Sequence, residues 1–127
     1  MKTAATVARY LLGVGCVVLG ANAFFEFLPA PENLPEQGGR FLGLLSESGY
    51  FVAVALLKIA GGLMLLLGRF VPLGLTLLGP ILVNILLYHL AFDPAGIGGG
   101  LVFTLLWFVV FWRHKGKFRF LWTASAD

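Results

Sequence analysis

The fold is decided by residues 50–92, YFVAVALLKIAGGLMLLLGRFVPLGLTLLGPILVNILLYHLAF. This stretch holds two apolar runs, 50–68 and 72–92, with only three residues between them. Each run is about 20 residues long, and a helix of that length crosses a hydrocarbon core of about 30 Å. Because the link is so short, the two helices should lie side by side and antiparallel. Both runs are apolar on all sides, which is typical of helices in lipid.

Two further apolar runs, 6–28 and 94–112, flank this pair. Of the 127 residues, 59% are hydrophobic and 12% are charged, whereas a soluble domain has roughly 25% charged residues. A soluble chain of this size has too little interior for so many apolar side chains. The composition therefore excludes an ordinary soluble globule, a disordered chain and a nucleic-acid-binding module. It predicts one all-α membrane domain over 1–127, an antiparallel bundle of four transmembrane helices.

The distribution of charge predicts the orientation of this bundle. One side collects seven of the nine basic residues, namely Lys2, Arg9, Arg69, Arg113, Lys115, Lys117 and Arg119. The other side has Arg40 together with the acids Glu26, Glu32, Glu36, Glu47 and Asp93. By the positive-inside rule, both termini should face the cytoplasm of a cell whose inner membrane holds the protein. Within the basic-aromatic tail, 113–127, and at Arg69, the cations should anchor the chain to anionic lipid, so the net charge of +3 needs no nucleic acid partner.

The one long loop, residues 29–49, should lie on the outer side. Pro29, Pro31 and Pro35 end the first helix. The segment 36–48 is too short to span and is expected to form a helix at the interface. Two interpretations stay open, a lid over an outward-facing cavity and a connector that lies along the membrane.

The start of the chain also resembles a signal peptide, because Lys2 and Arg9 precede an apolar stretch that ends in Ala21-Asn22-Ala23. The apolar run continues past that point, however, which favours a retained membrane helix. The single cysteine, Cys16, excludes a disulfide framework and a cysteine-rich zinc site. It is expected to be an inert buried residue.

Few polar side chains lie inside the four runs, and each is therefore informative. They fall in the central-to-outer half of the bundle: Asn22, Glu26, Lys58, Asn84, Tyr88 and His89. A charge at the centre of a bilayer costs about 2.5–3.5 kcal/mol on insertion scales, so Lys58 should face inward and meet Asn22, Glu26 or Asn84, or else be neutral. Together the six could line one polar pocket for a quinone head group or another small polar ligand. The alternative is that they only join helices. One histidine and one acid give too few ligands for a metal site.

Backbone features add to this picture. Pro80 should kink the third run beside Asn84, because it cannot donate to the carbonyl of Thr76. Glycines at 61–62 and in the pairs Cys16-x3-Gly20 and Gly96-x3-Gly100 should let helices approach closely.

Several stretches taken together resemble the DoxX-like family of small membrane proteins. The opening resembles the family at Ala8-Arg9-Tyr10-Leu11-Leu12-Gly13, and Gly20 to Phe25 is similar to its first-span ending. The most specific part is Arg69-Phe70-Val71-Pro72-Leu73 followed by Pro80 to His89. Matching positions are Asn22, Arg69, Pro72, Pro80, Asn84 and His89, while Lys58 departs from the family pattern.

The resemblance implies a four-helix membrane bundle with both ends in the cytoplasm and a loose link to redox chemistry. The sequence therefore predicts an accessory protein or subunit of a quinone- or thiosulfate-linked membrane system, with a membrane or redox protein, or a second copy of the chain, as its partner. Two alternatives are a small-molecule binding or transport protein and a structural scaffold without a ligand. No motif for haem, flavin or iron–sulfur ligation is present, so no cofactor is evident beyond a quinone. This favours a protein without catalytic activity of its own.

Overall fold

The structure is a computed structural model that describes residues 2–28 and 34–124. These residues form five α-helices, two short 3₁₀ helices and no strand, which confirms the all-α prediction. In chain order the elements are α1 (Lys2–Phe25), α2 (Glu36–Glu47), α3 (Tyr50–Leu67), α4 (Val71–Phe92), η1 (Pro94–Gly96), α5 (Gly98–His114) and η2 (Lys115–Trp122).

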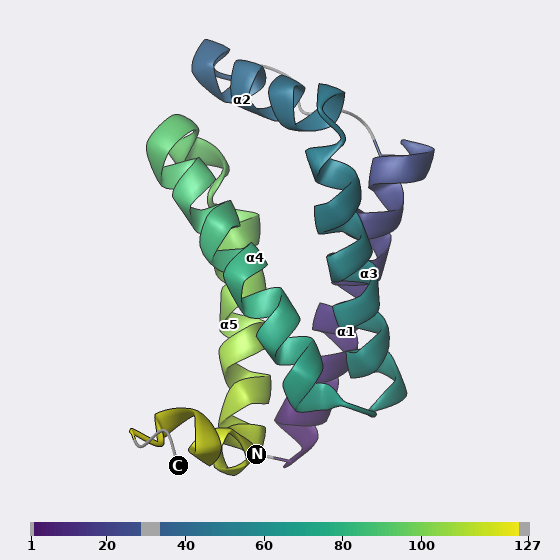
Figure 1. Cartoon of the computed structure of the whole chain (residues 1–127), viewed down its shortest axis with the longest axis vertical. Coiled ribbons are helices and arrows are strands. Elements are labelled where there is room, and N and C mark those ends of the chain that lie inside the picture. The colour runs from purple at the N-terminus through teal and green to yellow at the C-terminus, as the bar shows by residue number, and fades with distance from the viewer. Residues whose placement is uncertain (1, 29–33, 125–127) are drawn as a thin grey trace.

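The four long helices pack in a ring. Helix α1 contacts α3 and α5, and α4 contacts the same two helices. Figure 1 shows both ends of the described chain at one end of the molecule, beside η2, and α2 across the opposite end. We call these the terminal end and the α2 end. The α1–α3 pair and the α4–α5 pair lie close together at the terminal end and diverge toward α2.

Three helices, α1, α3 and α4, are long and apolar enough to cross a membrane, and they mark the chain as a membrane protein. The bounds of α3 and α4 are within one residue of the predicted runs. The fourth run differs from its prediction, because 94–96 form a 3₁₀ turn and α5 has only 17 residues. Asp93 makes no side-chain cap there, and the glycines at 96 and 98–100 have a low helix propensity.

The first helix also ends earlier than predicted, at Phe25 rather than residue 28. Glu26 has a φ of 49°, in the left-handed region, so the chain leaves the helix at this residue. The Asn22 side chain then accepts a hydrogen bond from the Leu28 N–H at 2.8 Å. The long loop contains α2, as predicted for 36–48, while its residues 29–33, Glu32 among them, lie outside the described part of the chain.

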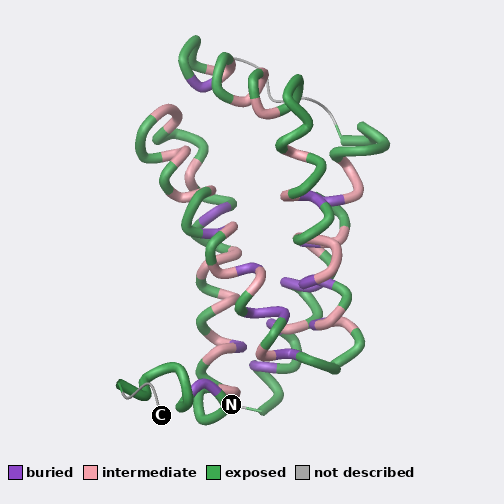
Figure 2. Tube along the Cα trace, viewed as in Figure 1, coloured by how far each residue is buried: buried purple, intermediate pink, exposed green. Residues whose placement is uncertain are grey.

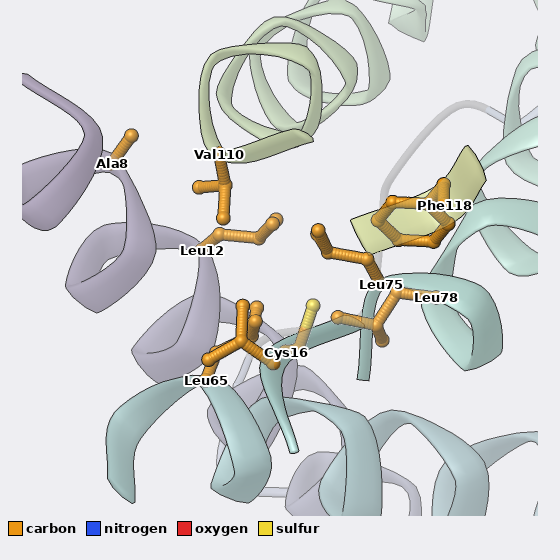
Figure 3. Packing of buried hydrophobic residues seen from close by; sticks show 9 residues of the cluster. Ala8, Leu12, Cys16, Leu65, Leu75, Leu78, Val110 and Phe118 are labelled. Carbon is orange, nitrogen blue, oxygen red and sulfur yellow. The ribbon is translucent and has the colours of Figure 1, made fainter. Parts of the chain in front are cut away.

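The hydrophobic core lies at the terminal end. Figure 2 shows exposed positions along every helix and buried positions where the helices face one another. Figure 3 shows the core side chains from four helices and η2 meeting, among them Leu12, Leu65 and Leu75, which have no exposed area. Phe118 of η2 joins this cluster with only 5% of its surface exposed. The tail is thus more than the interfacial anchor that its alternating sequence predicts, because one of its aromatic rings completes the core.

Glycines set the spacing of two helix pairs, as predicted. A Cβ built on Gly62 of α3 would lie 2.8 Å from the Gly13 carbonyl oxygen of α1, and one on Gly20 would lie 2.9 Å from the Ala55 carbonyl oxygen. A Cβ on Gly74 of α4 would lie 3.0 Å from the Gly61 carbonyl oxygen of α3. Only a hydrogen side chain fits at these crossings, so the α1–α3 and α3–α4 backbones are in near contact.

Candidate functional site

Two of the predicted pocket residues, Tyr88 and His89, lie together in the last turn of α4. Their rings meet edge to face, with centroids 5.0 Å apart. The imidazole Nδ1 of His89 is 3.3 Å from the carbonyl oxygen of Asp93, just past the end of the helix. The site therefore combines a phenol and an imidazole at the α2 end of the molecule.

The helix α2 covers Tyr88. Phe41 of α2 stacks on Tyr88 and on Phe92, with centroid distances of 6.0 and 5.3 Å. Gly38 is buried against the phenol, since a Cβ built there would lie 2.8 Å from the Tyr88 hydroxyl oxygen. That hydroxyl is the one buried side-chain polar atom without a hydrogen-bond partner among residues 2–28 and 34–124. Because α2 contacts both α3 and α4, it bridges the helix pairs where they diverge.

The other predicted pocket residues are placed apart from this pair. Lys58 is half-buried in the middle of α3, and its Cβ lies opposite Gly20 of α1. Asn22 uses its carboxamide oxygen to close the end of α1, and Glu26 is exposed. Within the described ranges, no hydrogen bond joins Lys58 to the partners that the sequence suggested.

Asn84 faces outward from α4. Its side chain is exposed, and its Nδ2 donates to the Pro80 carbonyl oxygen of the same helix at 2.8 Å. Pro80 lies on the same exposed face, and α4 continues through it to Phe92 without interruption. The structure thus joins Tyr88 and His89, while Asn84, one turn before Tyr88 on the same side of α4, bonds to Pro80 of its own helix, so a single pocket for all six residues stays a prediction.

The terminal end gathers basic side chains, and some of them have defined contacts. Arg9 donates from Nη1 to the Leu65 carbonyl oxygen in the last turn of α3, where a cation is favoured by the helix dipole. Lys115 Nζ lies 3.6 Å from the centre of the Trp112 ring. The predicted anchor residues Arg69, Arg113, Lys115, Lys117 and Arg119 are all exposed.

His114, which follows the fourth predicted span, belongs to this basic end. Burial lowers its pKa, and the nearby cations Lys117, Arg113 and Arg9 lower it further. Both effects disfavour the protonated imidazole. His114 is therefore held neutral at a pH where a free histidine would begin to gain a proton.

Sequence reasoning missed an apolar groove of about 670 Å³ lined by α4, α5 and η2. On its wall the indole N–H of Trp107 donates to the Leu75 carbonyl oxygen at 2.9 Å and so ties α5 to α4. Phe111 stacks on the same indole, with the rings 7° from parallel and centroids 5.2 Å apart. The available signal was the spacing of aromatic residues at 107, 108 and 111, which places them along one side of a helix.

Comparisons with known proteins add no relative. No family model, no curated protein and no solved structure matches the chain. The resemblance to DoxX-like proteins therefore rests on the sequence itself, at residues 8–13, 20–25, 69–73 and 80–89.

Proposed function

We propose that the chain is a small multi-pass protein of the bacterial inner membrane that serves as an accessory subunit of a redox system linked to quinone or thiosulfate. The three membrane-length helices support the location in a membrane. The link to redox chemistry is supported by the DoxX-like residue run from Arg69 to His89. The subunit role is supported by the outward position of Asn84 on α4.

A fourth crossing is part of this proposal. The 15 residues of α5 up to Trp112 give about 23 Å at 1.5 Å per residue. The three residues of η1 add about 6 Å at the steeper rise of a 3₁₀ helix. Together they match a hydrocarbon core of about 30 Å.

The proposed orientation has both termini in the cytoplasm. The basic residues of the tail and of α1 lie at the terminal end, whereas Glu36, Glu47 and Asp93 belong to segments at the α2 end. This separation supports the positive-inside orientation. A reporter fused after Asp127 that is active only in the periplasm would contradict it.

The observation that carries the subunit role is the outward position of Asn84. An exposed carboxamide in the middle of an apolar helix is costly in lipid, and its own helix occupies only one Nδ2 hydrogen. A helix of a partner protein can satisfy the remaining hydrogen-bonding capacity, and such contacts stabilise helix association by about 0.6 kcal/mol on average and at most about 1.7 kcal/mol. Asn84 is therefore assigned to a partner contact.

The test uses Asn84→Leu, with Thr76→Val as the matched control. Thr76 is also a polar, exposed residue of α4, but its hydroxyl already donates to the Pro72 carbonyl oxygen. After purification in mild detergent, the bound proteins and quinone are quantified by mass spectrometry. We expect Asn84→Leu to weaken partner retention about threefold to eighteenfold, and Thr76→Val to have no effect. Equal retention of the partner by Asn84→Leu and wild type would refute the assignment.

A second candidate function is the binding of a small molecule at the α2 end, favoured by the buried hydroxyl of Tyr88 that has no partner in the described part of the chain. This hydroxyl could donate to the carbonyl of a quinone, with His89 beside it. Tyr88→Phe should then reduce the quinone that co-purifies without changing partner retention. A preparation with neither quinone nor a protein partner would instead favour the structural scaffold.

A further inference from the structure

The groove between α4, α5 and η2 has the size of a ligand site, since its volume of about 670 Å³ lies in the range of roughly 300–1,000 Å³ found for small-molecule pockets. It follows α4 from Leu75 to Leu86 and α5 from Thr104 to Phe111. At the terminal end η2 contributes Phe118, Leu121 and Trp122 to the lining.

The walls of this groove offer little to a polar ligand. Thr76 and Thr104 donate their hydroxyl hydrogens to carbonyl oxygens of their own helices, at 2.8 and 2.7 Å. The Trp107 N–H is used in the bond to α4. A sugar, a nucleotide or a quinone ring would lose hydrogen bonds to water here without replacement. A hydrocarbon chain loses none, so the lining selects for an aliphatic occupant.

The length of the groove fits one leaflet of a bilayer. The eleven-residue separation from Leu75 to Leu86 along α4 corresponds to about 17 Å. One leaflet contributes about half of a hydrocarbon core of about 30 Å. The groove therefore suits a lipid acyl chain whose head group lies at the terminal end.

The charge at that end indicates which lipid. Residues three apart in a 3₁₀ helix share one row, so Arg119 lies in the row of Trp122, which lines the groove. Lys115, Lys117 and Arg119 are all exposed. The acidic residues in the described ranges belong to α2 or to the segments that follow α1 and α4, toward the α2 end. The head group would thus meet a cationic surface that favours an anionic phosphate.

A second copy of the chain fits less well. Two copies inserted in the same orientation would bring their basic terminal ends to the same depth in the membrane. The cations of both η2 segments would then repel each other beside the groove, whereas an anionic lipid neutralises them. We infer that this groove binds an acyl chain of an anionic phospholipid, with Arg119 holding the phosphate.

The experiment measures lipid retention by native mass spectrometry after transfer from vesicles of equal parts phosphatidylcholine and phosphatidylglycerol. Val83 lines the groove and is 55% exposed. Val83→Trp should fill the groove and remove the retained lipid. Leu87 is 56% exposed on the same helix, outside the lining. Leu87→Trp is therefore the control and should retain the lipid.

The head-group assignment has its own pair of variants. Arg119→Gln should lower the preference for phosphatidylglycerol about fivefold, the effect of one cation near an anionic surface, and Arg119→Lys should preserve it. Because Arg119 is exposed, neither change threatens the fold. Retention of both lipids in the vesicle proportion would overturn the inference. So would equal lipid retention by Val83→Trp and Leu87→Trp, or a wild-type dimer that Val83→Trp dissociates, since a second copy would then occupy the groove.

Discussion

The close crossing of α1 and α3 gives a quantitative prediction for Gly62→Ala. The new Cβ would lie 2.8 Å from both the Gly13 carbonyl oxygen and Val17 Cγ2, and 3.1 Å from the Val17 backbone nitrogen. Two of these three atoms belong to the backbone, so the helices must separate to admit the methyl group. Overpacking of this kind costs about 1–3 kcal/mol.

The opposing effect is the gain from replacing glycine in a helix, about 0.5–1 kcal/mol. Gly99→Ala isolates this gain, because a Cβ at Gly99 of α5 would have no neighbour within 4 Å. The difference between the two variants removes the propensity contribution and leaves the cost of the contact. We therefore expect Gly62→Ala to be less stable than Gly99→Ala by about 1–3 kcal/mol.

The assay is an unfolding titration with SDS in mixed detergent micelles, followed by tryptophan fluorescence, since Trp107 lies between α4 and α5. The free energy of unfolding is compared among wild type, Gly62→Ala and Gly99→Ala. If Gly62→Ala is as stable as Gly99→Ala, the α1 and α3 backbones do not approach as closely as described and the argument from glycine spacing fails.

Three further predictions concern the terminal end. Phe118→Ala should reduce the free energy of unfolding by about 3–5 kcal/mol in the same titration. The control Phe120→Ala, at a ring that is 72% exposed, should change this free energy little. Similar losses for both variants would mean that Phe118 is not a core residue. Arg9→Met should cost about 1.5–3 kcal/mol, because it removes a charged hydrogen bond to the Leu65 carbonyl oxygen, and an unchanged unfolding midpoint would speak against that bond. His114 has a pKa that is lowered in the folded protein by burial and by neighbouring cations. Its contribution to stability is therefore complete above the ordinary histidine pKa of about 6.5. This contribution is lost as the pH falls through the lower pKa of the folded state. His114→Asn should therefore flatten this part of the pH profile of stability, and a profile identical to wild type would exclude His114 as its source.

The sequence predicted where the membrane helices begin and end better than it predicted which side of each helix meets its neighbours. Helix limits were readable because uninterrupted apolar runs end at turn residues, as at Gly68, which has a φ of 67°. The direction of Asn84 was not readable, because a helix that is apolar on every side carries no periodic signal of which side meets its neighbours. The single pocket for six polar residues was predicted from their depth and from their spacing along each helix, and neither fixes how one helix is rotated toward the next.

Local chemistry explains other details of the structure. Asn22 was predicted to line a pocket, which stays a prediction, and its carboxamide oxygen accepts from the Leu28 N–H, because a side chain near a helix end can bond to nearby backbone groups at a small entropic cost. In the tail, cations alternate with aromatic residues, so no hydrophobic periodicity distinguishes Phe118 from Phe120. Only the tertiary contact with Phe111, at a centroid distance of 5.1 Å, makes that distinction.

The insertion of Phe118 has a consequence for biosynthesis. Its cluster includes Ala8 and Leu12 from the first helix, so the core unites segments of which one leaves the ribosome about a hundred residues after the other. Helices can enter the bilayer one after another and associate afterwards, but this core stays incomplete until η2 has been synthesised. A nascent chain stalled before residue 115 should thus have its helices inserted while their terminal ends are still loosely joined. Cotranslational quality control would encounter the protein in that open form.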